Sequence, residues 1–142
     1  MPVLYAKQLQ VTTDLAELSH VLGWFDQLEH DTIPAVIWMQ CQTALAEAFT
    51  NAVRHAHKGR SPDTPIDIEV IVFNRQLELR VWDYGAVFDL EQKLADMPYV
   101  AASEPGGRGL MLIAHLSDHV SYLRSADNRN CLILTKSYLP VV

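Results

Sequence analysis

The sequence predicts an α+β fold in which one mixed, largely antiparallel sheet carries its helices on one face. Segments with strand-like alternation follow one another in pairs, at 66–73 with 77–82 and at 119–123 with 131–138. Segments with helical spacing lie outside these pairs, at 14–28, 34–57 and 106–116. Grouped strands with separate helices favour a two-layer α+β architecture. The 142 residues suit a single domain, 1–142, with one core.

The composition narrows the classes of partner. Net charge is 11 − 17 = −6 with no basic run, which argues against direct binding of nucleic acid or of an anionic membrane. No apolar stretch approaches the length of a membrane span, and the first residues do not resemble a signal peptide. Cys41 and Cys131 lack a CxxC spacing. We therefore expect a reduced, cytoplasmic protein.

The first half of the chain alternates strand and helix signals. Apolar residues at every second position predict a strand over 3–11. Asp14 is placed to cap a helix to about residue 28, with Glu17 completing a capping box. Thr32 is placed to cap the next helix, whose first turn contains Pro34. That helix should end near His57, with Gly59 as its C-cap.

The second half begins with a hairpin whose turn is expected over 73–76. From residue 84 to 106 the periodicity is weak, apart from a helical turn or two around 90–97. A loop of this length inside a compact domain is usually functional or mobile. A helix follows to about residue 116, and then two strands joined by a turn at 127–130.

A polar stripe on the long helix is the first candidate functional feature. Glu47, Asn51 and His55 are spaced by four residues, which places them along one helical face. The face that packs on the core is formed by Cys41, Leu45, Phe49, Ala52 and Ala56. Polar groups on a mostly buried helix are costly unless they meet polar partners. Taken alone, the stripe fits a solvated face equally well.

Two glycine-containing motifs follow. Asp83-Tyr84-Gly85 ends a strand, where a carboxylate can accept from an exocyclic amine and a glycine lets a flat ligand approach the backbone. An ordinary turn explains the same three residues. The run 106–109 opens a helix, where free amides and a forked arginine attract phosphate. A flexible loop is the alternative there.

The remaining histidines and the tryptophans favour structural roles. His55 and His57 fall on different helix faces, and His115 and His119 straddle a helix end. Without a third ligand nearby, surface or capping roles are favoured over a metal site. The three tryptophans, Trp24, Trp38 and Trp82, lie within apolar patterns and are interpreted as core or interface residues.

In order and spacing, the three motifs resemble the nucleotide-binding boxes of the GHKL ATPase superfamily. Residues 47–55 resemble its N box, Asp83-Tyr84-Gly85 with Phe88-Asp89 its first glycine box, and 107–110 its second. The resemblance covers roughly residues 13–136 and implies a Bergerat-type sandwich. The strings at 47–56 and 107–110 are most similar to anti-sigma factor serine kinases of bacterial partner-switching systems.

The resemblance implies a role for each motif residue. Asn51 would bind the Mg²⁺ that bridges the phosphates of ATP, and Glu47 would be the catalytic base. Asp83 would hold the adenine amine, with Gly85 giving room beside it. Because phosphoryl transfer depends mainly on metal, positioning and charge neutralisation, these groups would suffice for it.

The remaining motif residues would also contact ATP. The amides of Gly107 and Gly109, with Arg108, would face the phosphates, and Leu110 closes that box. His55 closes the N box, with a role left open. The segment from Asp89 to Pro105 would form a lid.

Three departures from the family pattern bear on activity. Val87 stands where the first glycine box often has a second glycine, which puts ATP turnover in more doubt than ATP binding. Asn130-Cys131 stands where a threonine often helps to bind adenine. A dimerising phosphoacceptor helix, required by the histidine-kinase interpretation, is not found before the domain.

The resemblance therefore implies an ATP- and Mg²⁺-dependent serine/threonine kinase that regulates transcription. Its partners would be an anti-anti-sigma antagonist protein, which it phosphorylates, and a sigma factor, which it holds inactive; a homodimer is left open. Two alternatives are a non-catalytic, nucleotide-gated binding module and a detached ATPase domain of an unrelated signalling system.

Overall fold

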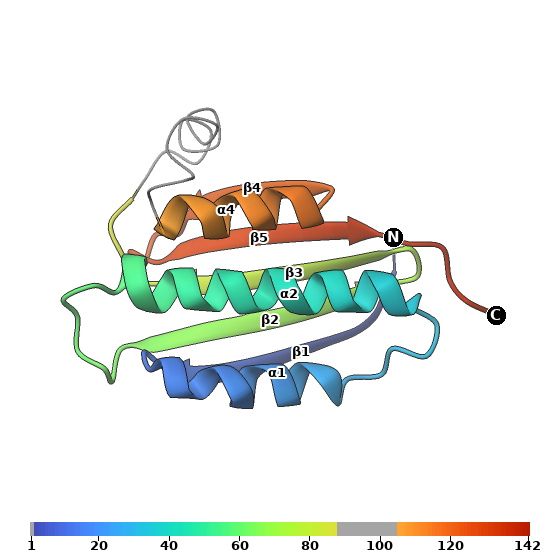
Figure 1. Ribbon diagram of the computed structural model, residues 1–142, viewed down its shortest axis with the longest axis horizontal. Helices are drawn as coiled ribbons and strands as arrows, with labels where there is room; N and C mark the ends of the chain where they lie inside the picture. The colour runs from blue at the N-terminus through green and yellow to red at the C-terminus, as the bar shows by residue number, and fades with distance from the viewer. Residues whose placement is uncertain (1, 88–104) are drawn as a thin grey trace.

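The computed structural model describes residues 2–87 and 105–142 as one sheet covered by helices on a single face (Figure 1). The strands are β1 (Val3–Thr12), β2 (Pro65–Phe73), β3 (Gln76–Asp83), β4 (His119–Arg124) and β5 (Asn130–Ser137). The helices are α1 (Leu18–Asp26), α2 (Ala35–Asn51) and α4 (Pro105–Leu116), with a 3₁₀ turn, η1 (Leu15–Glu17), before α1 and a π-helical turn, η2 (Ala52–Ala56), after α2. The predicted α+β class is confirmed.

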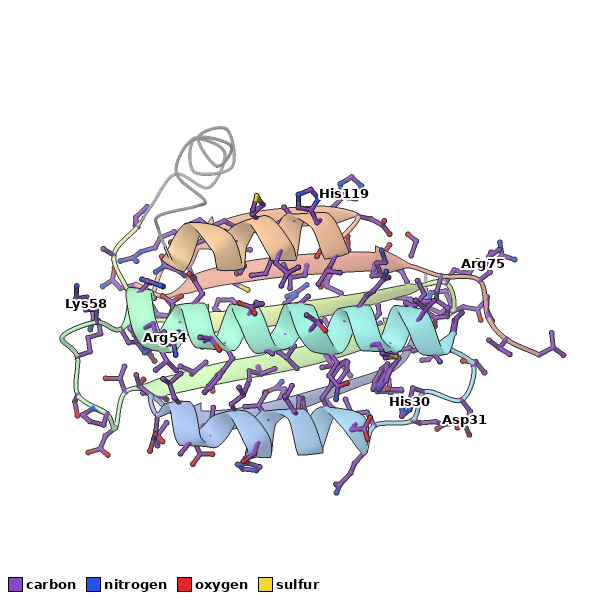
Figure 2. The ribbon with its side chains drawn as sticks, viewed as in Figure 1. His30, Asp31, Arg54, Lys58, Arg75 and His119 are labelled. Carbon is purple, nitrogen blue, oxygen red and sulfur yellow. The ribbon has the colours of Figure 1, made fainter. Side chains whose placement is uncertain are left out.

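The sheet has the strand order β1-β2-β3-β5-β4. Each pairing between described strands is antiparallel, so the parallel component expected of a mixed sheet is not found among them. β2 and β3 are joined by a two-residue turn, Asn74-Arg75, as predicted. In Figure 1, α2 lies between α1 and α4, across the middle of the sheet. Lys58 and Arg75 lie at opposite ends of the molecule (Figure 2).

The core lies between the helices and one face of the sheet. Alternate residues of β2 and β3, such as Ile68 and Leu79, are buried in the same core cluster as Leu45 and Phe49 of α2. This is the pattern expected of an antiparallel sheet covered on one side. Trp38 belongs to the core and Trp24 packs against it.

Trp82 lies on the opposite face of the sheet, outside the core. Its indole N–H donates to Glu69 Oε1, and the Arg129 guanidinium lies 4.5 Å from the ring centroid. Trp82 is therefore not a core residue. Successive side chains of β3 point to opposite faces of the sheet, and Trp82 is on the face away from the helices.

Several helix ends differ from the predicted ones. Asp14 caps as expected, accepting from the Ala16 amide, but it caps the 3₁₀ turn that precedes α1. The Glu17 carboxylate contacts His20 Nδ1 at 2.9 Å, so it pairs with the next turn of the helix. Pro34, and not Thr32, precedes the first residue of α2. Gly59 follows the helix with a positive φ of 82°, as a C-capping glycine does.

Among the described residues, no helix is both long and apolar enough to cross a membrane. The two cysteines are free thiols and are buried. Burial raises the pKa of both the Cys41 and the Cys131 thiol to about 12, so these thiols are unreactive near neutral pH.

Candidate functional site

Three buried polar side chains converge on the end of β3. Among the described residues, His57, Asp83 and Asn130 are the polar or charged side chains that are buried, with 2%, 7% and 1% of their surface exposed. They come from the end of the long helix, the end of β3 and the start of β5. Buried polar groups are costly unless they are hydrogen-bonded, so this cluster is the strongest candidate for a functional site.

The Asp83 carboxylate is held through one of its two oxygens. Oδ1 accepts from the Gly85 amide and from the Asn130 side-chain amide, both at 2.8 Å. Donors from the described part of the chain reach only this oxygen. Oδ2 is therefore the candidate acceptor for a ligand on this carboxylate.

Two further donors hold the segment after β3 through the backbone carbonyl oxygen of Gly85. Gly85 O accepts from Asn130 Nδ2 at 2.8 Å and from the Arg124 guanidinium at 3.1 Å. The same guanidinium donates to Asn130 Oδ1 at 2.8 Å, which fixes the orientation of that amide. Asn130, noted above as a departure from the family pattern, thus makes three side-chain hydrogen bonds, to Asp83, Gly85 and Arg124. The sequence pattern did not single out Arg124.

A glycine is required at position 85 because the backbone there passes close to the backbone of Ala56. A Cβ at this position would lie 2.6 Å from the carbonyl oxygen of Ala56 and 2.9 Å from its Cα. Sequence reasoning assigned this glycine to the space beside a flat ligand. The structure gives an additional reason, because the end of β3 packs directly on the end of the long helix.

Replacing Gly85 by alanine should therefore lower the free energy of unfolding by about 1–3 kcal/mol, as overpacking does. Gly23 offers a matched control, because it lies in α1 and a Cβ there meets nothing within 4 Å. Gly23→Ala should stabilise by about 0.5–1 kcal/mol through helix propensity. Urea denaturation measures both changes, and two variants of equal stability would contradict the packing assigned to Gly85.

The long helix that carries the predicted polar stripe changes from an α-helix to a π-helix before its third member, His55. The helix is α-helical to Asn51 and π-helical from Ala52, with the His57 amide bonded to Ala52 O at 2.9 Å. The helical geometry therefore changes between the second and the third member of the predicted stripe. Glu47 and Asn51 are half-buried, whereas His55 is exposed and His57 is buried. Such π-helical insertions are frequent at functional sites.

The glycine run opens α4, as predicted, with the first helical residue at Pro105. Gly107 and Arg108 lie among the first four residues, whose amides lack acceptors within a helix and can bind phosphate. Gly109 follows them, and a Cβ there would lie 3.3 Å from Glu47 Oε2. The carboxylate of the first motif is thus beside the helix opened by the third. Leu110 is buried in the core.

The structure describes only some of the other residues that the sequence singled out. Phe88, Asp89 and the predicted lid up to residue 104 lie outside the described residues. Val87 is exposed. The described residues contain no group of three His, Cys, Asp or Glu side chains that could hold a metal ion. The Asn51 amide suits Mg²⁺ all the same, because that ion is commonly held by one or two protein oxygens together with phosphates and water.

Comparison with known proteins identifies the family. The model of the histidine kinase-like ATPase domain matches residues 11–136. The serine-protein kinase RsbW of Listeria monocytogenes serotype 4a (strain HCC23) is 41% identical over 83 residues, which cover 54% of this chain and 52% of that protein. RsbW of Bacillus subtilis (strain 168) is 40% identical over 83 residues, with 54% and 51% covered. The matched region spans about half the length of each of these curated relatives.

A solved structure shares the fold. One chain of the SiaB–SiaC complex from Pseudomonas aeruginosa superimposes with a TM-score of 0.63 at 13% identity, covering 95% of this chain and 90% of that chain. The family model includes Glu47 and Asn51, the end of β3 and the start of α4, which are the elements that meet at the site. The chain therefore belongs to the histidine kinase-like ATPase domain family.

Proposed function

We propose that the chain binds Mg-ATP where α2, β3 and α4 meet and transfers the γ-phosphate to a serine of a small antagonist protein. The observation that carries this proposal is the position of Glu47, whose carboxylate lies beside Gly109 at the start of α4. A carboxylate next to a helix start that suits phosphate is placed to accept a proton from an attacking hydroxyl. The relatives named serine-protein kinase support the same reaction.

In this proposal each motif residue has one task. Asp83 accepts from the adenine amine through Oδ2, and the amide of Gly107 with Arg108 faces the phosphates. Asn51 holds Mg²⁺, which neutralises and orients the phosphate oxygens. Glu47 takes the serine proton. His55 is exposed at the π-helical turn, and its role stays open.

The biological role that we propose is that of a cytoplasmic anti-sigma factor. The chain would hold a sigma factor inactive when the antagonist is absent or already phosphorylated. Recovering the proteins that co-purify with it from the cell that encodes it, and then adding radiolabelled ATP, tests both partners. The proposal requires a sigma factor among them and phosphoserine on a second, small protein. ATP binding without any labelled protein would favour a nucleotide-gated binding module, and unrelated partners would favour another signalling system.

The site should prefer adenine over guanine. A hydrogen bond to a charged group contributes about 1.5–3 kcal/mol, which corresponds to about 10- to 100-fold in affinity, and guanine presents a carbonyl where adenine presents its amine. Competition between ATP and GTP for the wild-type chain measures this preference.

The variant Asp83→Asn sharpens this experiment. An asparagine oxygen can still accept from Gly85 and Asn130, which places its NH₂ group where Oδ2 stood. That donor would oppose the adenine amine, so the preference for ATP should largely disappear. Equal affinities for ATP and GTP in the wild type, or an unchanged preference in Asp83→Asn, would contradict the assignment of Asp83.

A further inference from the structure

His57 connects the end of the long helix to the segment that follows β3. The residue is the C-cap of the helix and is 2% exposed. Its Nε2 lies 2.8 Å from the backbone nitrogen of Tyr84, and its Nδ1 lies 2.8 Å from Thr13 Oγ1. Tyr84 stands between Asp83 and Gly85. The imidazole therefore bonds directly to the peptide between Asp83 and Tyr84, within the segment expected to receive adenine.

The hydrogen bonds determine which nitrogen carries the proton. A backbone N–H can only donate, so Nε2 of His57 must accept from Tyr84 and carries no hydrogen. The proton of the neutral ring is then on Nδ1, which donates to Thr13 Oγ1. The Thr13 hydroxyl in turn donates to the Thr64 carbonyl oxygen at 2.6 Å. The whole chain of bonds is consistent only with the neutral Nδ1–H tautomer.

The surroundings favour this neutral ring near pH 7. Burial lowers the pKa of the His57 imidazole below its ordinary value of 6.5. The Asp83 carboxylate acts in the opposite direction, and the Arg60 guanidinium lowers the pKa further. Tyr84, whose ring centroid lies 6.4 Å from that of His57, is the other titratable neighbour from the β3 side. A second proton on the ring would place an N–H on Nε2 facing the Tyr84 N–H.

We propose that His57 is a positioning residue, whose neutral imidazole holds the Asp83–Gly85 segment in the geometry that binds adenine. This inference rests on the proposed ATP site and adds to it a pH dependence. Because binding needs the unprotonated ring, affinity is full above pH 6.5 and falls as the pH drops through the lowered pKa of His57. Asn130 and Arg124 hold this segment from the side of β4 and β5. The bond from the Tyr84 amide to His57 holds it from the side of the long helix, where Gly85 also packs closely on Ala56.

The test compares the wild type with His57→Gln between pH 5 and 8 by calorimetric titration with Mg-ATP. A glutamine can accept from Tyr84 through its oxygen and donate to Thr13 through its nitrogen, but it does not titrate. The ratio of the two dissociation constants cancels the titration of the ATP phosphates and of every other group. We expect a ratio near one at pH 8 and a relative weakening of the wild type by about two- to tenfold at low pH, the effect of one hydrogen bond.

A second variant and a spectroscopic measurement complete the test. His57→Phe, which keeps a planar ring and removes both bonds, should bind ATP more weakly than the wild type at pH 8. The ¹⁵N chemical shifts of the His57 ring in the free protein should show that Nδ1 is protonated and Nε2 is not. A ratio that is flat with pH, or the opposite tautomer, would overturn the role of His57 while leaving the ATP site intact. Failure of both the wild type and His57→Gln to bind ATP at pH 8 would overturn both proposals.

Discussion

Replacing Glu47 by glutamine is expected to slow phosphate transfer by at least about 100-fold while Mg-ATP still binds. A general base contributes about 10²–10⁴-fold to a rate, and glutamine keeps the size of the side chain but cannot accept the proton. The substitution should be tolerated beside Gly109, because the glutamine amide has nearly the same shape as the carboxylate. Single-turnover transfer of radiolabelled phosphate to the co-purified antagonist measures the effect.

A matched control is Glu17→Gln, which makes the same chemical change in the η1 turn, where the carboxylate pairs with His20 at the surface. That variant should transfer phosphate at the wild-type rate. Parallel losses of ATP affinity and rate in Glu47→Gln would instead assign Glu47 to binding the metal or to the structure.

The variant Asn51→Ala is expected to lose Mg-dependent ATP affinity by at least about tenfold. Even partners that only support a metal ligand typically contribute 10–100-fold to metal affinity, and Asn51 is the proposed ligand itself. Binding measured without Mg²⁺ should change far less, because the adenine contacts from Asp83 remain. Calorimetry with ATP, with and without Mg²⁺, separates the two contributions.

Asn74→Ala provides the control for this experiment. Asn74 precedes Arg75 in the turn between β2 and β3, at the end of the molecule opposite Lys58 (Figure 2). Its replacement should leave ATP binding unchanged both with and without Mg²⁺. If Asn51→Ala behaves like Asn74→Ala, Asn51 is not the metal ligand.

The sequence predicted those features that follow from local patterns. Alternation of apolar residues, as at Ile66 and Ile68, placed β2 and its buried face. The turn at Asn74-Arg75 and the glycine run at the start of α4 were also recognised from residue types alone. Glu47 and Asn51 were correctly paired on one helical surface, because the helix is regular over that span.

The features that the sequence did not predict depend on non-local contacts or on an irregular turn. Asn130 bonds to Asp83 across 47 positions, and Gly85 meets Ala56 through backbone atoms that no side-chain pattern reports. The π-helical turn uses ordinary helix-forming residues, so the sequence pattern did not reveal it. His57 is the C-cap of the helix, which agrees with the expected capping role, but the sequence did not predict that its ring is buried.

An NMR titration of the wild-type chain with Mg-ATP tests most directly whether the three motifs form one nucleotide site. The backbone amides of Asn51, Gly85 and Gly109, together with the side-chain amide of Asn130, should shift in a single saturable transition. The hairpin around Asn74 should not move. An absence of shifts, or shifts confined to a surface away from the ends of α2 and β3, would contradict the site.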